Sequence, residues 1–224
     1  MFCLGILSDA AIQHHIHSIT LPIPSRVTGK PVSLEEVLHD RSRSGLQIKE
    51  KCRIALTLAT AVLQLHGTPW LSETWSMKDI YFVENSKNAM LSDQPYVSKN
   101  FTPTPGFTTP RHKRPRLVKN SIIFALGVAL LEVSYGKPIS SFKTAEDWDH
   151  DGKRTVWTEF SVADRLADAL RDCELANYFN AVYRCVHYNF ESSSYSLTDD
   201  GFRERFYQGV VVPLQQDYDY ATRQ

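Results

Sequence analysis

The chain has 224 residues, which is long enough for one hydrophobic core or two small ones. Hydrophobic residues make up 42% of the chain and charged residues 22%, a balance that is ordinary for a globular protein and excludes wholesale disorder. The 25 basic residues equal the 25 acidic ones, so no overall field attracts nucleic acid or an anionic membrane, and partners must be recognised by local patches.

The first thirty residues include a proline-rich turn and carry no periodic pattern. We expect them to form an N-terminal segment ahead of one domain over residues 31–218, with a C-terminal tail at 219–224. No basic region precedes the early apolar residues, so a signal peptide is not expected. The longest apolar run, Ile122 to Leu131, is too short to cross a bilayer. The cytosol is therefore the expected compartment, with the nucleus as the alternative.

Helical signals begin at Ser33, which has the spacing of a capping box with Glu36 and predicts a short helix over residues 34–39. A longer helix follows over residues 48–66, where apolar side chains recur at helical spacing. This helix is apolar almost all round, which is typical of a core element. It is expected to end at Gly67, just before a proline.

The middle of the chain predicts a small β element. Two brief strand-like runs, residues 80–83 and 89–91, flank a polar turn and favour a β-hairpin. A loop rich in proline and threonine is expected from Asp93 to about Lys119, and it carries the basic run RHKRPR. Loops this long inside a compact domain are usually functional or disordered.

The last hundred or so residues again predict helices. A buried helix is expected from Ser121 to Tyr135, closed by Gly136. Three amphipathic helices follow, over about residues 162–171, over about residues 175–190 and after Thr198. Ser161 is the expected N-cap of the first, and Phe202, Phe206 and Val210 are expected to line the core side of the third. The fold class is therefore mainly α with a small β-hairpin.

Taken in order, these segments resemble the C-terminal lobe of a protein kinase. SLEEVLHD resembles the short helix after the hinge, and IKEKCRIALTLATAVLQLH resembles the long helix that leads to the catalytic loop. DIYFV and NAMLSD resemble the hairpin around the metal-binding Asp. FALGVALLEVSYGKPI resembles the buried central helix, in which Gly127 and Glu132 match the usual pattern. The resemblance implies a C-lobe whose N-lobe is absent or vestigial, with residues 1–30 as a hinge-like remnant.

The chain is more closely similar to a fungal family of unknown function that has this kinase-like lobe. ANYFNAVYRCVHYNF, SLTDDGFRERFY and VVVPLQQDY are similar to the end of that family, and the similarity covers roughly Pro31 to Tyr218. Its members often follow helical prion-inhibition (HeLo-like) domains in proteins tied to allorecognition or immune-like signalling. The resemblance thus implies a protein partner or a neighbouring domain.

The resemblance also gives counterparts for the kinase catalytic groups. If Asp79 stands for the metal-binding Asn, the catalytic Asp falls on Thr74, and Asp93 matches the metal-binding Asp but is followed by Gln94-Pro95. A threonine cannot take the substrate proton as a carboxylate does, unless a slip of one residue brings in Glu73. No G-x-G-x-x-G phosphate loop occurs. We therefore expect vestigial positions and no bound cofactor.

Two other patterns could indicate a metal site, but each fits a structural role better. The run from Asp147 to Gly152 imitates half of an EF-hand, but Thr158 stands where the bidentate Glu is required, so a solvated acidic loop is expected. The histidines at 14–17, and Cys185 near a histidine, lack the ligand pattern of a zinc site. Scattered cysteines favour buried thiols over disulfides. They are Cys3, Cys52, Cys173 and Cys185.

The sequence therefore predicts a catalytically inactive, pseudokinase-type interaction or regulatory domain. The basic loop expected to contact its partner carries Arg111, Lys113, Arg114 and Arg116. One alternative is an atypical phosphotransferase that uses Mg-ATP at Asp79 and Asp93. Another is nucleic-acid binding through the basic loop, which is less expected because no aromatic residues alternate with the charges. A third is a lobe that exposes an apolar face and does little alone.

Overall fold

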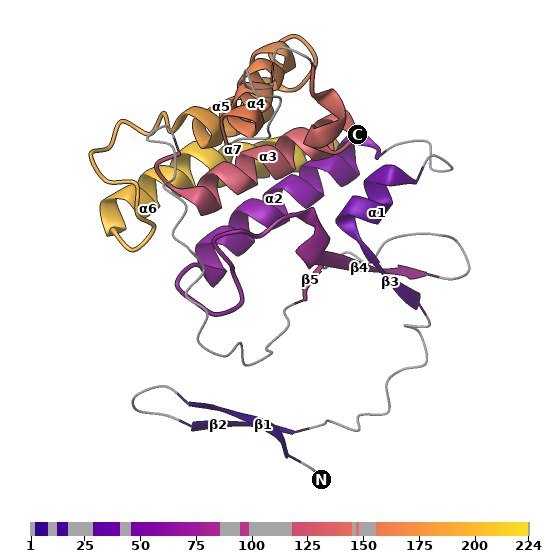
Figure 1. Cartoon of the computed structure of the whole chain (residues 1–224), viewed down its shortest axis with the longest axis vertical. Coiled ribbons are helices and arrows are strands. Elements are labelled where there is room, and N and C mark those ends of the chain that lie inside the picture. The colour runs from indigo at the N-terminus through magenta and orange to yellow at the C-terminus, as the bar shows by residue number, and fades with distance from the viewer. Residues whose placement is uncertain are drawn as a thin grey trace.

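A computed structural model gives the fold of most of the chain. It describes residues 3–8, 13–17, 29–40, 46–85, 95–98, 118–144, 147 and 156–223. In these residues the protein is mainly helical, with a small three-stranded antiparallel sheet beside the helices and a separate two-stranded pair (Figure 1). None of the helices in the described ranges is both long enough and apolar enough to span a membrane.

The three-stranded sheet has the order β3 (Gly29–Ser33), β4 (Ile80–Asn85), β5 (Tyr96–Val97), and both pairings are antiparallel. β4 confirms the strand predicted at residues 80–83. Its described neighbours are β3 and β5, whereas the predicted partner at residues 89–91 lies outside the described residues. β5 falls in the segment expected to be a loop. Pairing across the sheet, rather than local alternation, makes these strands, and Phe82 of β4 is buried in the core.

The first thirty residues contain strands that the sequence did not predict. β1 (Cys3–Ser8) and β2 (Gln13–His17) pair antiparallel in a sheet of their own. β3 then begins at Gly29, so strands occur at three places in a segment for which the sequence predicted no element. Each run is short, and β2 is polar, so no alternation of apolar and polar residues marks them as strands.

The first two helices confirm their predictions. α1 (Leu34–His39) begins with the predicted capping box, in which the Ser33 amide donates to the Glu36 carboxylate at 2.8 Å. α2 (Ile48–Leu65) is followed by Gly67 with a φ of 73°, a conformation that glycine adopts without strain. Most of the predicted apolar face is buried, except that Ile48 at the start of the helix is exposed.

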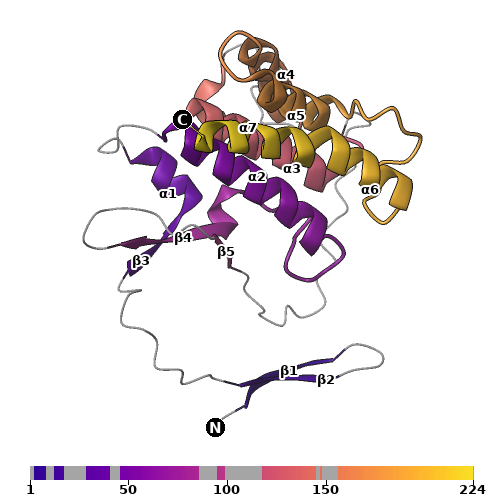
Figure 2. The same cartoon turned by 180° about the vertical axis from the view of Figure 1, so that it is seen from behind.

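α3 (Ser121–Tyr135) has the predicted bounds and lies among α2, α4 and α5 (Figure 2). The Asn120 side chain caps it by accepting hydrogen bonds from the amides of Ile122 and Ile123. Gly136, with a φ of 64°, closes it as predicted. Because its apolar residues surround the helix, α3 is the centre of the core.

The described residues from 156 onward form four helices and a π-helical segment. They are α4 (Val156–Leu170), α5 (Ala176–His187), α6 (Asp200–Phe206), the π-helical segment Tyr207–Val211 and α7 (Val212–Thr222). Phe202, Phe206 and Val210 are buried, which confirms the predicted core side of α6 and its continuation.

Two boundaries in this region differ from the sequence prediction. α4 begins ahead of Ser161, so that residue is not its N-cap; the Ser161 hydroxyl donates instead to Asp147 at 3.3 Å. Helix α7 continues through Thr222, into the segment expected to be a tail, because Ala221 is buried against the body. Both helices are extended by tertiary contacts that a local pattern does not contain.

Candidate functional site

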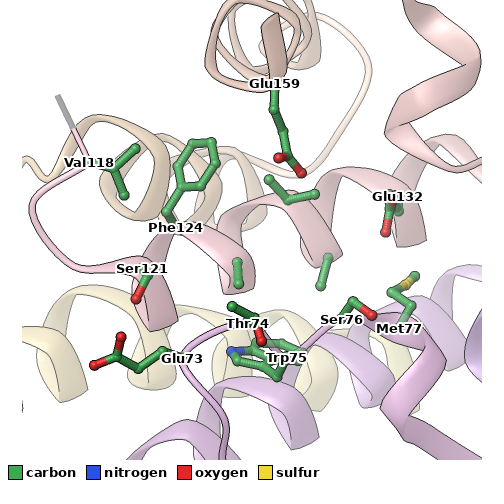
Figure 3. A pocket seen from close by; sticks show the side chains of 13 residues that line it. Glu73, Thr74, Trp75, Ser76, Met77, Val118, Ser121, Phe124, Glu132 and Glu159 are labelled. Atoms are coloured by element: carbon green, nitrogen blue, oxygen red, sulfur yellow. The ribbon is translucent and has the colours of Figure 1, made fainter. Parts of the chain in front are cut away.

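A cavity of about 360 Å³ lies between the loop that follows α2 and the central helix α3 (Figure 3). Its walls come from the loop at residues 73–77, from α3 and from the start of α4. The residues that line it are Glu73, Thr74, Trp75, Ser76, Met77, Val118, Ser121, Phe124, Ala125, Val128, Ala129, Glu132 and Glu159. Its volume is at the small end of the range for ligand pockets.

Trp75 fixes the loop against α3. Its side chain is 5% exposed, and its indole N–H donates to the Ile122 carbonyl at 3.3 Å. This contact joins an indole and a backbone carbonyl, which carry no net charge. The loop is thus held in place without adding a carboxylate to the site.

The floor of the cavity is formed by apolar side chains. One face of α3 presents Phe124, Ala125, Val128 and Ala129 to it, at the i, i+1, i+4 and i+5 positions of the helix. The ring of Phe124 stacks on that of Phe160 in α4, with their centroids 5.9 Å apart. The two alanines are small, so the floor is recessed between larger neighbours.

Carboxylates stand around this floor. Glu132 comes from α3, Glu159 reaches from α4 towards α3, and Glu73 comes from the loop (Figure 3). No lysine or arginine is among the described residues that line the cavity. Burial raises the pKa of the Glu132 carboxyl to about 7, although the Ile139 amide donates to it at 2.8 Å and opposes the rise. The cavity is therefore acidic in residue type, and the Glu132 carboxyl is partly protonated near neutral pH.

The raised pKa predicts a dependence of stability on pH. The folded state binds the Glu132 proton more tightly than the unfolded chain, whose carboxyl has the ordinary value of 4.5. The protonated Glu132 carboxyl therefore contributes fully to the free energy of unfolding below pH 4.5. This contribution is lost as the pH rises through the folded-state pKa of about 7. The Glu132→Gln variant keeps an acceptor for the Ile139 amide but cannot ionise. We expect its free energy of unfolding to fall less than that of the wild type between pH 5 and pH 8, by about 2 kcal/mol.

Urea unfolding followed by circular dichroism at several pH values measures this difference. A matched control is Glu191→Gln, because Glu191 is exposed and does not line the cavity. The control is expected to keep the pH dependence of the wild type. Parallel curves for the wild type and Glu132→Gln would show that Glu132 ionises normally.

Of the predicted kinase-like positions, the structure brings Thr74 and Asp79 together at a second cavity, described below, whereas Thr74 alone of the two lines the first. Thr74 lines the first cavity, and its hydroxyl lies 3.1 Å from that of Ser72. Asp79 does not line it: its carboxylate accepts from the Ser76 amide at 2.9 Å and so closes the 3₁₀ turn Met77–Asp79. Asp93 lies outside the described residues. Asp79 therefore has a capping role in this fold.

The predicted basic loop also lies outside the described residues. It comprises Arg111, Lys113, Arg114 and Arg116. The described chain resumes at Val118, which lines the cavity. In sequence, the basic run therefore ends two residues before a wall of the acidic cavity.

A second cavity of about 340 Å³ lies on the other side of Trp75. It is lined by Trp70, Leu71, Ser72, Thr74, Trp75, Lys78, Asp79, Ile80, Tyr81, Val97 and Ser98. Lys78 lies 3.6 Å from the Glu35 carboxylate and is largely exposed. This cavity is more polar in its lining and contains the Asp79 cap, whereas the carboxylates of Glu132 and Glu159 belong to the first cavity.

The expected acidic loop is only partly as predicted. Asp147 is buried rather than solvated: it accepts from the Thr144 amide at 2.7 Å and from Arg165 at 3.0 Å. Burial opposes ionisation, but these hydrogen bonds outweigh it and hold the pKa of Asp147 below its usual range. Residues 148–155 lie outside the described residues. Asp147 thus ties α4 to the segment that precedes it.

The cysteines and histidines form no metal site in the part of the chain that the structure describes, where no three such ligands or carboxylates cluster. Cys52 and Cys185 are buried as predicted, and burial raises the pKa of Cys52 to about 11. Cys173 is exposed. His187, close to Cys185 in sequence, faces Asp164 at 3.5 Å. The buried thiols are therefore packing residues with little thiolate at neutral pH.

Three features of the cavity were not found from the sequence. Glu132 was noticed only as part of a helix pattern, and neither Glu159 nor Trp75 was singled out. Glu159 belongs to a different helix, and the Trp75 contact joins a loop to the carbonyl of a distant residue. A carboxylate at an otherwise apolar position of a buried helix was the one signal available, and it pointed to Glu132.

Comparison with known proteins assigns the chain to a family. A search of the curated proteins found no match. The model of a family described as a domain of unknown function (DUF7580) matches residues 4–221, which is nearly the whole chain. The predicted membership of a family of unknown function is thereby confirmed, and the chain belongs to the DUF7580 family.

Proposed function

We propose that this chain is a catalytically inactive, kinase-like domain that binds a protein partner. The observation that carries the proposal is the chemistry of the first cavity, between the loop at residues 73–77 and α3. Its described lining offers glutamates over a carbon floor and no lysine or arginine. Kinases stabilise the triphosphate with cations and amide donors, so this lining is unsuited to ATP. It suits an apolar or cationic group instead.

The residues at the kinase-like positions support an inactive domain. Thr74, the counterpart of the catalytic Asp, has a hydroxyl that pairs with Ser72 and cannot serve as a general base. Asp79, the counterpart of a metal ligand, holds the Ser76 amide. Recruiting Asp79 to a metal would cost the cap of a turn next to the cavity.

The order of elements supports the kinase-like part of the proposal. A short helix, a long helix, a loop, a strand and a buried helix with Gly127 and Glu132 follow one another as in the C-lobe resemblance. The link to HeLo-like domains and to allorecognition or immune-like signalling in fungi rests on that resemblance alone. It makes a neighbouring signalling domain the first partner to examine.

A thermal-shift titration with Mg-ATP tests the proposal. A ligand that binds only the folded state raises the melting temperature, so an inactive domain is expected to shift by less than about 1 °C at saturating Mg-ATP. An active protein kinase measured alongside provides the positive control. A magnesium-dependent rise that is lost in Asp93→Ala would overturn the proposal in favour of a phosphotransferase.

A further inference from the structure

The cavity combines an apolar surface with carboxylate side chains. Its floor is the apolar face of α3, which includes Ala125, Val128 and Ala129. Glu132 on α3 and Glu159 on α4 both line the cavity, and Glu159 reaches from α4 towards α3 (Figure 3). A ligand that fills it must bury carbon and also satisfy carboxylates.

The charges around Glu132 favour a cation. Glu159 on α4 and Glu35 on α1 both disfavour its ionised form, and His39 on α1 is the basic side chain that acts in the opposite sense. The Ile139 amide uses one oxygen of the carboxylate. An arriving cation would be attracted by several carboxylates and would itself favour ionisation of Glu132.

We propose that this cavity binds a peptide segment of a partner protein in which a basic residue stands next to an apolar side chain. This inference rests on the proposed function. The basic group would lie between Glu132 and Glu159, and the apolar side chain would cover the alanine-lined floor. A cavity of about 360 Å³ holds a few side chains, so the contact is with a short segment. Charge-assisted hydrogen bonds to carboxylates would give the preference for a basic residue.

Peptide pools test this recognition directly. Two fluorescein-labelled, end-blocked pools have either arginine or citrulline at the centre, and their flanking positions are drawn from alanine, leucine, valine and serine. Citrulline keeps the shape of arginine but has no charge. The full chain is expected to bind the arginine pool about tenfold more tightly in fluorescence polarisation. Equal binding of the two pools, or no binding of either, would overturn the proposal.

Variants connect the preference to the cavity. Glu132→Gln and Glu159→Gln are each expected to reduce the preference for arginine by about threefold or more, whereas Glu191→Gln leaves it unchanged. The preference is also expected to grow from pH 6 to pH 8 in the wild type, because Glu132 ionises over this range, and to stay flatter in Glu132→Gln. A preference that survives both cavity variants would place the peptide elsewhere and overturn the assignment.

The chain's own basic run requires a separate control. The control is a variant in which glutamine replaces all four basic residues: Arg111, Lys113, Arg114 and Arg116. Its affinity for the arginine pool is expected to stay within about twofold of the wild type if a partner segment is the ligand. Binding that appears only in this variant would identify the chain's own segment as the occupant. If the peptide test fails while the Mg-ATP titration is flat, the proposal of a basic peptide ligand is rejected, but the proposal of an inactive domain stands.

Discussion

Replacing Phe202 by alanine is expected to lower the free energy of unfolding by about 3–5 kcal/mol. The Phe202 ring is 0% exposed and packs edge-on against Phe190, with the ring centroids 5.2 Å apart. A second aromatic contact joins it to Tyr195 at 6.0 Å. Alanine would remove the buried surface and leave a cavity that these rings fill only in part. The Asp199 cap of α6 would remain, because it accepts from the backbone amide of residue 202.

Urea unfolding monitored by circular dichroism measures the loss, with the m-value showing whether the transition is still cooperative. The matched control is Tyr207→Ala in the π-helical segment that follows, where the side chain is 43% exposed. This control is expected to change stability by less than about 1 kcal/mol. A similar small loss for Phe202→Ala would mean that α6 does not pack on the core as described.

The packing of Phe202 illustrates what the sequence could reveal. Helices that bury one continuous face follow from local periodicity, so α2, α3 and the inward side of α6 were found with small errors in their bounds. The strands β3 and β5 depend on pairing with β4 across long stretches of chain. No local pattern carries that information, and Pro31 within β3 pointed to a turn instead.

The site was predictable to a similar degree. Thr74 and Glu132 were noticed because each occupies a position in a sequence pattern, and both line the cavity. Their meeting with Glu159 depends on how α4 packs against α3, and α4 itself begins earlier than Ser161 suggested. That extension follows from burial of Thr158 and stacking of Phe160, which are tertiary effects.

Gly127 sets how closely α3 approaches α5, and Gly127→Ala is expected to destabilise the fold by about 1–3 kcal/mol. A Cβ atom here would lie 2.9 Å from Val186 Cγ2 and 3.2 Å from the Val186 amide nitrogen. The nitrogen belongs to the backbone of α5, so the helix itself must move to relieve the contact. Alanine favours helices over glycine by about 1 kcal/mol, which the steric cost is expected to exceed.

The matched control is Gly201→Ala in α6, because the same substitution there introduces a Cβ whose nearest neighbour is an Asp199 oxygen at 3.4 Å. Its expected effect is between neutral and a gain of about 1 kcal/mol, whereas Gly127→Ala is expected to lose stability. Thermal and urea unfolding of both variants measure the contrast. Equal or greater stability of Gly127→Ala would mean that α3 and α5 are packed less closely than described. In that case the carbon floor on the other face of α3, which depends on the same helix, would also lose its fixed position.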